Sequence, residues 1–181
     1  MGYELAVTPL QLAAAYAVFA NGGVLFEPSL VREVRGADGA VRWRHERRPV
    51  RRVVPAPVAN QLAHMLLGVV EEGTGRAAAL GTYPVAGKTG TARRNIGGRY
   101  PAGHYTASFV GLFPGVHPQL VLVVKIDDPS GSYFGGSTAA PVTRTILEAA
   151  LATPGVTLDR SRLSRRRAPE VPDVAAASGP A

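Results

Sequence analysis

The sequence predicts an α+β fold in which helices flank an antiparallel sheet. The first observation is that strand-like segments follow one another at residues 85–93, 105–113 and 120–126, and that no helical period separates them. Parallel strands need long crossover connections, usually helical, so these consecutive strands are expected to pair antiparallel. The second observation is that segments with helical periodicity precede and follow the strands, as in folds that pack helices on such a sheet.

The first helix is expected to begin after Thr8 and to end at the Asn-Gly-Gly sequence of residues 21–23. Thr8 is a favourable N-cap, Pro9 suits the first helical position, and Gln11 completes a capping box. The apolar side chains that recur at helical spacing along this segment are Leu12, Ala15, Tyr16 and Phe19.

A hairpin is expected next, over residues 24–45. Residues 24–35 have an extended pattern with a break at Pro28, residues 36–39 have the composition of a turn, and residues 41–45 alternate like a strand. The arginine-rich stretch that follows, at residues 47–55, carries no strand prediction.

The remaining elements are predicted from periodicity and from turn residues. Helices are expected at residues 57–72 and 138–151, with a short helix at residues 76–80 between them. The strongly apolar run at residues 120–124 predicts a strand that is buried on both faces. A polar loop is expected at residues 127–136.

The composition limits the size of the protein and the chemistry available to it. The chain has 181 residues, 46% hydrophobic and 18% charged, which suits one domain with a small appendage. We expect residues 1–153 to form the domain and residues 154–181, rich in arginine, proline and alanine, to form a disordered basic tail. Cysteine is absent, which excludes a disulfide scaffold, a thiolate metal site and a cysteine nucleophile. Four scattered histidines have no metal-binding spacing, so neither a metal nor a cofactor is expected.

The sequence shows no targeting or transmembrane segment. Its longest apolar stretch near the start covers residues 12–20, whereas a spanning helix needs ~20 apolar residues. The first residues lack the basic region of a signal peptide.

The segment that carries chemistry is Val-Ala-Gly-Lys-Thr-Gly-Thr-Ala, at residues 85–92. A phosphate-binding P-loop needs a glycine five positions before Gly87, where the chain has Thr82, and Pro84 lies inside the supposed loop. A nucleotide site is therefore only a remote alternative. On an edge strand, Lys88 would supply a positive charge to a substrate carboxylate, while Gly90 would let a substrate backbone come close. Hydroxyls suited to the same carboxylate are those of Thr89 and Thr91.

Several segments in order along the chain carry a resemblance to a known family. They are residues 7–13, 69–75, 86–92, 105–111 and 134–142. Together they resemble the C-terminal part of the transpeptidase domain of class B penicillin-binding proteins, over about residues 2–152. The resemblance implies the serine β-lactamase-like fold, incomplete here, and the Lys-Thr-Gly strand of that superfamily.

The resemblance also implies a function, in peptidoglycan synthesis for division or for elongation. Its reaction is acyl transfer through a serine ester, on stem peptides that end in D-Ala-D-Ala, and β-lactams acylate the same serine. Lys88 would aid the electrostatics of the site and bind the substrate carboxylate together with Thr89, Gly90 and Thr91, and the Thr91 N–H would be an oxyanion-hole donor. A full-length member would act at the extracytoplasmic face of the cell membrane. Other cell-wall synthesis proteins are possible partners.

Two motifs of that family are absent from the chain. The Ser-x-x-Lys motif would need serine at Val85 or at Leu122, three residues before the two lysines, Lys88 and Lys125. The Ser-x-Asn motif would need serine two residues before an asparagine, where the chain has Phe19, Val58 and Arg93. No nucleophile is therefore expected here, and we expect inactivity without the missing N-terminal part. The alternative is a non-catalytic module of the same fold, either penicillin-sensor-like or partner-binding.

Other polar features receive structural interpretations. The arginines of residues 42–52 and 160–167 suggest a solvated hairpin and a basic tail, with anionic cell-wall polymer or lipid as an alternative and no nucleic acid expected. Asp127-Asp128 is interpreted as a loop, and Ser108 and Ser137 as structural residues. His104 and Tyr105 are candidates to line a cleft beside the Lys-Thr-Gly strand.

Overall fold

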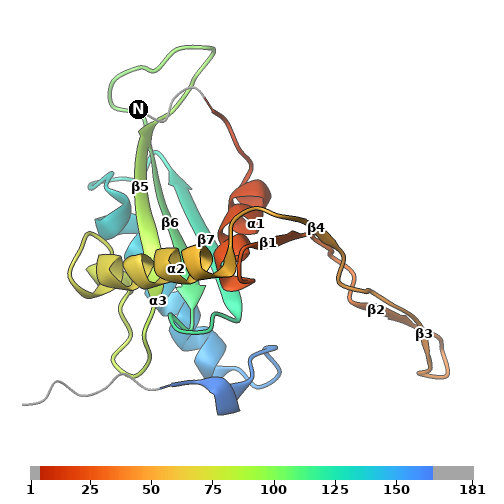
Figure 1. Ribbon diagram of the computed structural model, residues 1–181. Helices are drawn as coiled ribbons and strands as arrows, with labels where there is room; N and C mark the ends of the chain where they lie inside the picture. The colour runs from red at the N-terminus through yellow and green to blue at the C-terminus, as the bar shows by residue number, and fades with distance from the viewer. Residues whose placement is uncertain (1–4, 165–181) are drawn as a thin grey trace, which may run out of the picture.

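A three-stranded antiparallel sheet forms the centre of the protein (Figure 1). The computed structural model describes residues 5–164. Strands β5 (Ala86–Arg93), β6 (Tyr105–Phe113) and β7 (Leu120–Asp127) lie in the order β5-β6-β7, and each pair is antiparallel. The predicted α+β class is thereby confirmed, with strand bounds within one residue of those expected.

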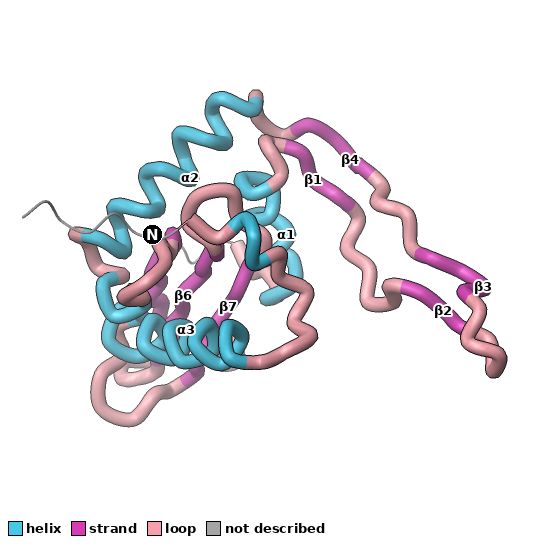
Figure 2. The backbone as a smooth tube through the Cα atoms, turned by 90° about the horizontal axis from the view of Figure 1, so that it is seen from below, coloured by secondary structure: helices cyan, strands magenta, loops and turns pink. Residues whose placement is uncertain are grey.

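Helices cover the two faces of this sheet (Figure 2). Helix α3 (Gly135–Ala152) lies on one face, and helices α1 (Pro9–Ala20) and α2 (Ala56–Glu71) lie on the other. Buried side chains between the sheet and α3 form the main core, among them Phe109, Phe113, Val124, Ala139, Ala140 and Leu147. A smaller core joins α1 and α2 to the sheet at Leu67, Ala86 and Leu112.

The start of α1 is as predicted. The Thr8 hydroxyl accepts a hydrogen bond from the Gln11 N–H at 3.2 Å, and the Gln11 side chain accepts one from the Thr8 N–H at 2.8 Å. This reciprocal capping box satisfies two of the backbone donors that a helix start leaves free. Tyr16 and Phe19, one turn apart and edge to face at 5.7 Å, then pack on the smaller core.

The predicted hairpin is longer than expected and projects from the rest of the protein (Figures 1 and 2). At its base, β1 (Val24–Phe26) pairs with β4 (Pro49–Arg52); farther out, β2 (Glu33–Arg35) pairs with β3 (Val41–Arg44). We call residues 24–52 the arm. Strand β4 was not predicted, because its arginine-rich residues lack apolar alternation and are all exposed.

The burial predicted for the third sheet strand is wrong. Residues 120–123 are half-buried, and Val124 is the one residue of β7 that is classed as buried. The reason is that β7 is an edge strand among the described residues. In addition, Val123 lines a hollow on one face of the sheet.

The packed part of the chain continues beyond α3. Leu158 is buried in the main core, and Val156 and Leu163 pack against that core, so ordered packing extends past the boundary predicted at residue 153. Short 3₁₀ turns lie at Arg76–Ala78 and Arg160–Arg162. The predicted disorder of the tail falls mostly on residues 165–181, outside the described residues. Within residues 5–164, no helix combines the length and hydrophobicity needed to cross a bilayer.

Candidate functional site

The Lys-Thr-Gly segment lies on β5, at an edge of the sheet. Ala86 and Gly87 at the start of this strand are buried, whereas Lys88 and Thr91 are exposed. A β-carbon on Gly87 would lie 2.4 Å from the Phe109 ring, so this glycine lets β5 lie directly over the main core. The motif is therefore a regular strand in register with β6, and not a loop that leads into a helix, which contradicts the P-loop alternative.

The register shows which backbone groups of β5 remain free. The Arg94 N–H donates to the His104 carbonyl at 3.0 Å, so residue 94 and every second residue before it point their backbone groups toward β6. The backbone N–H and C=O of Thr89 and Thr91 must then point to the open edge. In agreement, the Lys88 ammonium donates to the Thr89 carbonyl at 2.9 Å. The Thr91 N–H is thus available to a molecule at this edge.

The two threonine hydroxyls tie β5 to its neighbours on the α3 face of the sheet. Thr89 Oγ1 lies 2.7 Å from Thr74 Oγ1, in the turn after α2. Thr91 Oγ1 accepts a hydrogen bond from the Gly135 N–H, at the first residue of α3, at 3.1 Å. Three segments far apart in the sequence therefore converge here. The role of Thr74 was missed, and only its place in the Gly-Thr-Gly turn of residues 73–75 hinted at it.

Glycines allow this convergence. A β-carbon on Gly90 would lie 2.4 Å from Ser108 Oγ on the neighbouring strand. One on Gly135 would lie 2.4 Å from the Gly90 carbonyl oxygen, and one on Gly136 would lie 2.3 Å from the Thr74 carbonyl oxygen. Gly90 thus has a packing reason of its own, and its proposed contact with a substrate backbone stays a prediction.

Lys88 lies on the face of the sheet opposite α3, by strand alternation. Its side chain is exposed and forms no ion pair with a carboxylate within residues 5–164. The charge is therefore free to interact with a negatively charged group from outside the described chain.

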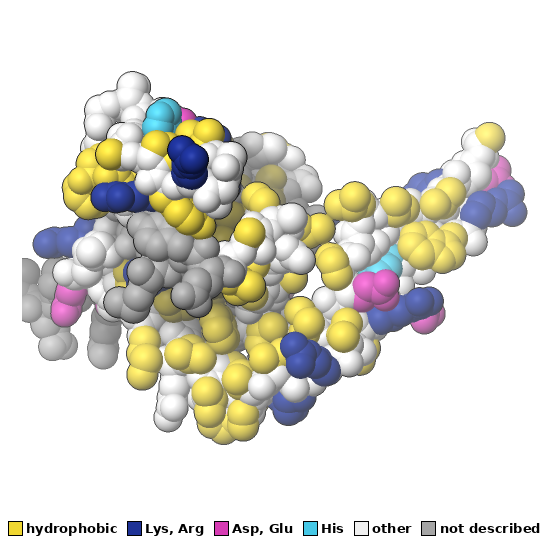
Figure 3. Space-filling model, turned by 90° about the horizontal axis from the view of Figure 1, so that it is seen from above, with side chains coloured by type: hydrophobic (Ala, Val, Ile, Leu, Met, Phe, Trp, Pro, Cys, Tyr) yellow, Lys and Arg dark blue, Asp and Glu magenta, His cyan; other side chains and the backbone are white. Residues whose placement is uncertain are grey.

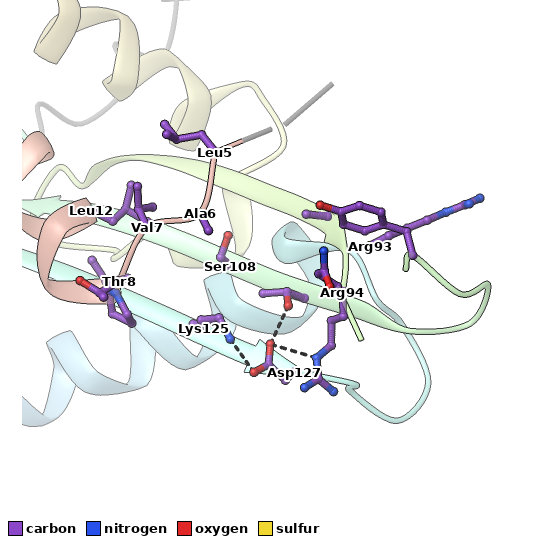
Figure 4. A pocket seen from close by; sticks show the side chains of 16 residues that line it. Leu5, Ala6, Val7, Thr8, Leu12, Arg93, Arg94, Ser108, Lys125 and Asp127 are labelled. Atoms are coloured by element: carbon purple, nitrogen blue, oxygen red, sulfur yellow. Dashed lines mark hydrogen bonds and ion pairs between the residues drawn. The ribbon is translucent and has the colours of Figure 1, made fainter. Parts of the chain in front are cut away.

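A hollow of about 590 Å³ lies on that same face (Figure 4). Strands β5, β6 and β7 form its floor with Ala92, Ser108 and Lys125, and the segment that leads into α1 forms a wall with Leu5 and Val7. Ser108 and Lys125 are paired in register. The Lys125 ammonium donates to Asp127 at 2.5 Å and forms no hydrogen bond with Ser108 among the described residues, so Ser108 keeps its structural interpretation.

At the end of β7, Asp127 and Asp128 both pair with Arg94, and Asp127 also pairs with Lys125. Hydrogen bonds from Lys125 and then from Thr106 lower the pKa of Asp127 below its ordinary value. Partial desolvation raises the pKa of Asp128, but hydrogen bonds from His104 and Arg94 outweigh it and the net shift is downward. Both carboxylates are therefore ionised structural partners, although Asp127 is the last residue of β7 and not part of the loop as expected.

His104 and Tyr105, the two residues expected to line a cleft, contact different neighbours. His104 Nδ1 lies 3.2 Å from Asp128 Oδ2, so its ring is directed to the ion-pair network. The Tyr105 ring stacks on Tyr133 at 4.1 Å, and Tyr133 lies 4.5 Å from Phe134, which is 57% exposed. Phe134 directly precedes Gly135, whose N–H donates to Thr91, so one end of this aromatic cluster lies near Thr91. The contact of Tyr133 was not predicted, because the sequence does not indicate which residue an aromatic side chain in a loop will pack against.

Ser137, the other serine considered as a rival nucleophile, has local partners only. Its hydroxyl lies 2.6 Å from that of Ser132 and also contacts the Phe134 carbonyl at 3.2 Å. No histidine, lysine or carboxylate that could act as a base bonds to it within the described residues. The described residues also contain no group of three or more side chains that could bind a metal.

Comparison with known proteins shows which family the chain resembles. Residues 1–148 match the penicillin binding protein transpeptidase domain. The chain is 41% identical over 153 residues to the probable peptidoglycan D,D-transpeptidase PbpC of Pseudomonas aeruginosa, covering 83% of this chain and 25% of that protein. It is 34% identical over 169 residues to stage V sporulation protein D of Bacillus subtilis, covering 91% of this chain and 26% of that protein.

A solved structure gives the same result. The ceftriaxone acyl-enzyme complex of penicillin-binding protein A from Mycobacterium tuberculosis superposes with a TM-score of 0.71 at 31% identity, covering 82% of this chain and 33% of that one. The chain spans about a quarter of the length of the two curated relatives. It belongs to the penicillin-binding protein transpeptidase family, of which it carries the Lys-Thr-Gly part of the domain.

Proposed function

We propose that this chain supplies one side of the active site of a peptidoglycan D,D-transpeptidase that also binds β-lactams. The observation that carries the proposal is the free edge of β5, where the Thr91 N–H points outward beside Lys88 and two threonine hydroxyls. A strand edge of this kind can pair with an extended peptide through its backbone groups. The full-length protein would act at the extracytoplasmic face of the cell membrane.

Each residue of the site has a distinct role in this proposal. Lys88 attracts the terminal carboxylate of the stem peptide, with Thr89 and Thr91 as hydrogen-bond donors to it. Because Thr91 Oγ1 accepts from the Gly135 N–H, its own O–H is left to donate. The Thr91 N–H, at the open edge, stabilises the oxyanion that forms on the attacked carbonyl.

The nucleophile comes from outside this chain. In the proposed reaction a serine oxygen bonds to the carbonyl carbon of the penultimate D-alanine, and the C–N bond to the last D-alanine breaks, releasing that residue. The amine of a second stem peptide then bonds to the same carbon and frees the serine. Because the chain contains neither Ser-x-x-Lys nor Ser-x-Asn, we expect it to form no acyl-enzyme alone.

Labelling with a fluorescent penicillin tests the proposal. We expect no covalent band on a denaturing gel with the purified chain. We expect a band when the chain is expressed in one polypeptide with the upstream reading frame, provided that this frame encodes Ser-x-x-Lys. A stable band on the isolated chain would overturn the assignment of the nucleophile. An upstream frame without the motif would support the non-catalytic alternative.

A matched pair of variants in the longer polypeptide tests the role of β5. Replacing Lys88→Ala removes the charge and is expected to lower the rate of acylation at least about tenfold, since charge-assisted hydrogen bonds contribute about 1.5–3 kcal/mol. Arg76→Ala, at an exposed arginine away from the strand, is the control and should acylate like the parent. Equal rates for both variants would contradict the assigned role of Lys88.

A further inference from the structure

Within residues 5–164, no third strand or helix packs on the two strands of the outer half of the arm (Figures 1 and 2). A two-stranded hairpin is marginally stable in water unless another surface covers its apolar face. The outer half, β2 and β3, would therefore gain stability if a partner covered one of its faces.

One face of the outer arm pairs its own charges. Glu33 accepts from Arg35 at 2.6 Å and from Arg44 at 3.0 Å. At the turn, Asp38 accepts from Arg42 at 2.8 Å. The two arginines lower the pKa of Glu33 through hydrogen bonds, so this carboxylate stays ionised. Each charged side chain of this network has a partner within it, although its three arginines exceed its two carboxylates by one.

The opposite face is mainly apolar and carries one arginine, Arg32. Val34 is directly opposite Trp43 on this face, and Val41 follows toward the turn, beyond a shift in the strand register. These three side chains are 48%, 47% and 42% exposed. His45 lies 6.2 Å from the Trp43 ring, and its N–H bonds to the Arg32 carbonyl, which places Arg32 on the same face. Arg32 forms no side-chain ion pair within residues 5–164.

The arm as a whole is positively charged. Residues 24–52 contain eight arginines and four carboxylates. Two of those carboxylates belong to the opposite face, and the other two, Glu27 and Glu46, line a hollow of about 510 Å³ near Trp43 and Arg48. Figure 3 shows hydrophobic side chains gathered along the arm with arginines between them. Just before Arg32, Leu30 is 96% exposed.

We propose that this apolar, basic face of the arm binds the surface of an anionic lipid bilayer. Tryptophan and aliphatic side chains enter the interface between headgroups and acyl chains, while arginines remain at the negatively charged headgroups. The proposal does not depend on transpeptidase activity, because it rests on the arm alone.

Charge and area argue against other occupants of this face. A second copy of the chain would bring two positively charged arms together, which is repulsive. The face is about 14 Å long and 10 Å wide from strand dimensions, roughly 140 Å². A stable protein–protein interface needs ~800 Å² on each partner. A bilayer has no such minimum, because each inserted side chain contributes in proportion to its own area.

Intrinsic fluorescence tests the proposal directly, because Trp43 is the single tryptophan of the chain. The purified chain is mixed with vesicles of phosphatidylcholine alone or with 30% phosphatidylglycerol. We expect the emission of Trp43 to shift to the blue with the anionic vesicles only, and the shift to weaken in high salt. Flotation of the vesicles in a density gradient measures the bound fraction independently.

Variants locate the binding. Arg32→Gln together with Arg48→Gln should lower the partition coefficient about thirtyfold, whereas lysine at both positions should preserve it. Val34→Asp should abolish the blue shift. Met65→Asp is the matched control, since this side chain is 68% exposed on α2, away from the arm, and binding should be unchanged. Circular dichroism confirms that each variant keeps its secondary structure.

Three outcomes would overturn the proposal. Equal binding to neutral and anionic vesicles would exclude headgroup recognition. Binding that survives Val34→Asp would place the contact on another surface. A blue shift produced by soluble poly-glutamate, or by self-association in sedimentation without vesicles, would assign the face to an acidic protein or to a second copy.

Discussion

The two faces of the central sheet differ in how far this chain completes them. Under α3 the face is closed: Phe109, Phe113 and Leu147 are fully buried in one continuous core. On the opposite face α1 and α2 cover one end, and the hollow over Ser108 and Lys125 leaves the other end open. The closed face holds β5 in place, whereas the open face carries Lys88. This difference shows that the residues of this chain support β5 fully on one face and leave the other face, which carries Lys88, partly uncovered.

The largest expected effect comes from the closed face. Phe109→Ala should lower the free energy of unfolding by about 3–5 kcal/mol, because it removes a fully buried ring and leaves a cavity. Val123→Ala on the open face is the comparison. It should cost less than about 1.5 kcal/mol, because Val123 is half-buried beside the hollow. Urea unfolding measures both values, and equal losses would remove the distinction between the faces.

The next effect tests the convergence at the start of α3. Gly135→Ala places a β-carbon 2.3 Å from the Ser108 carbonyl oxygen, so we expect a loss of about 1–3 kcal/mol from backbone displacement. Gly68→Ala is the matched control, because a β-carbon there meets nothing within 4 Å and alanine favours the helix by about 1 kcal/mol. Opposite signs for the two changes in thermal melting temperature are expected; a loss at both glycines would contradict the packing argument.

Removing the hydroxyl of Thr74 has a smaller expected effect. Thr74→Val breaks its 2.7 Å contact with Thr89 and should cost about 0.5–1.5 kcal/mol in urea unfolding. Thr145→Val is the control, since its hydroxyl donates to the Pro141 carbonyl at 3.2 Å within α3 and the side chain is exposed. A loss no larger than that of the control would indicate that the hydroxyl pair does not stabilise the junction.

The fold was predictable where periodicity and turn residues agree. The capping box at Thr8 and the three sheet strands followed from local residue types alone. Strand β4 could not be predicted from local residue types. It pairs with β1, about 25 residues earlier in the chain, and its own residues do not alternate between apolar and polar. The double-sided burial expected for residues 120–124 failed because burial depends on neighbours, and β7 has a neighbour at one edge only among the described residues.

The edge strand that carries the candidate site was predictable, but the contacts of its residues were not. Lys88 to Thr91 stand out as a short motif, so the edge strand could be assigned from the sequence. The contacts of Thr74 and Gly135 with β5 could not, because they join positions 15 and 44 residues apart. Similarly, the stacking of Tyr105 on Tyr133 depends on how a polar loop folds back over the sheet.

The smallest expected effect concerns Asp127, at the rim of the open face. Its pKa is lowered by Lys125 and Thr106, so its contribution to stability is present above the unfolded pKa of about 4 and is lost as the pH falls through the lower folded value. Because the carboxylate is 37% exposed, solvent screening limits this contribution to less than about 1 kcal/mol. Asp127→Asn should therefore flatten the acid limb of the unfolding free energy below about pH 4 and leave the rest nearly unchanged. Lys125→Met should flatten it as well, and an unchanged acid limb in both variants would show that the rim ion pair adds nothing to the stability of the open face.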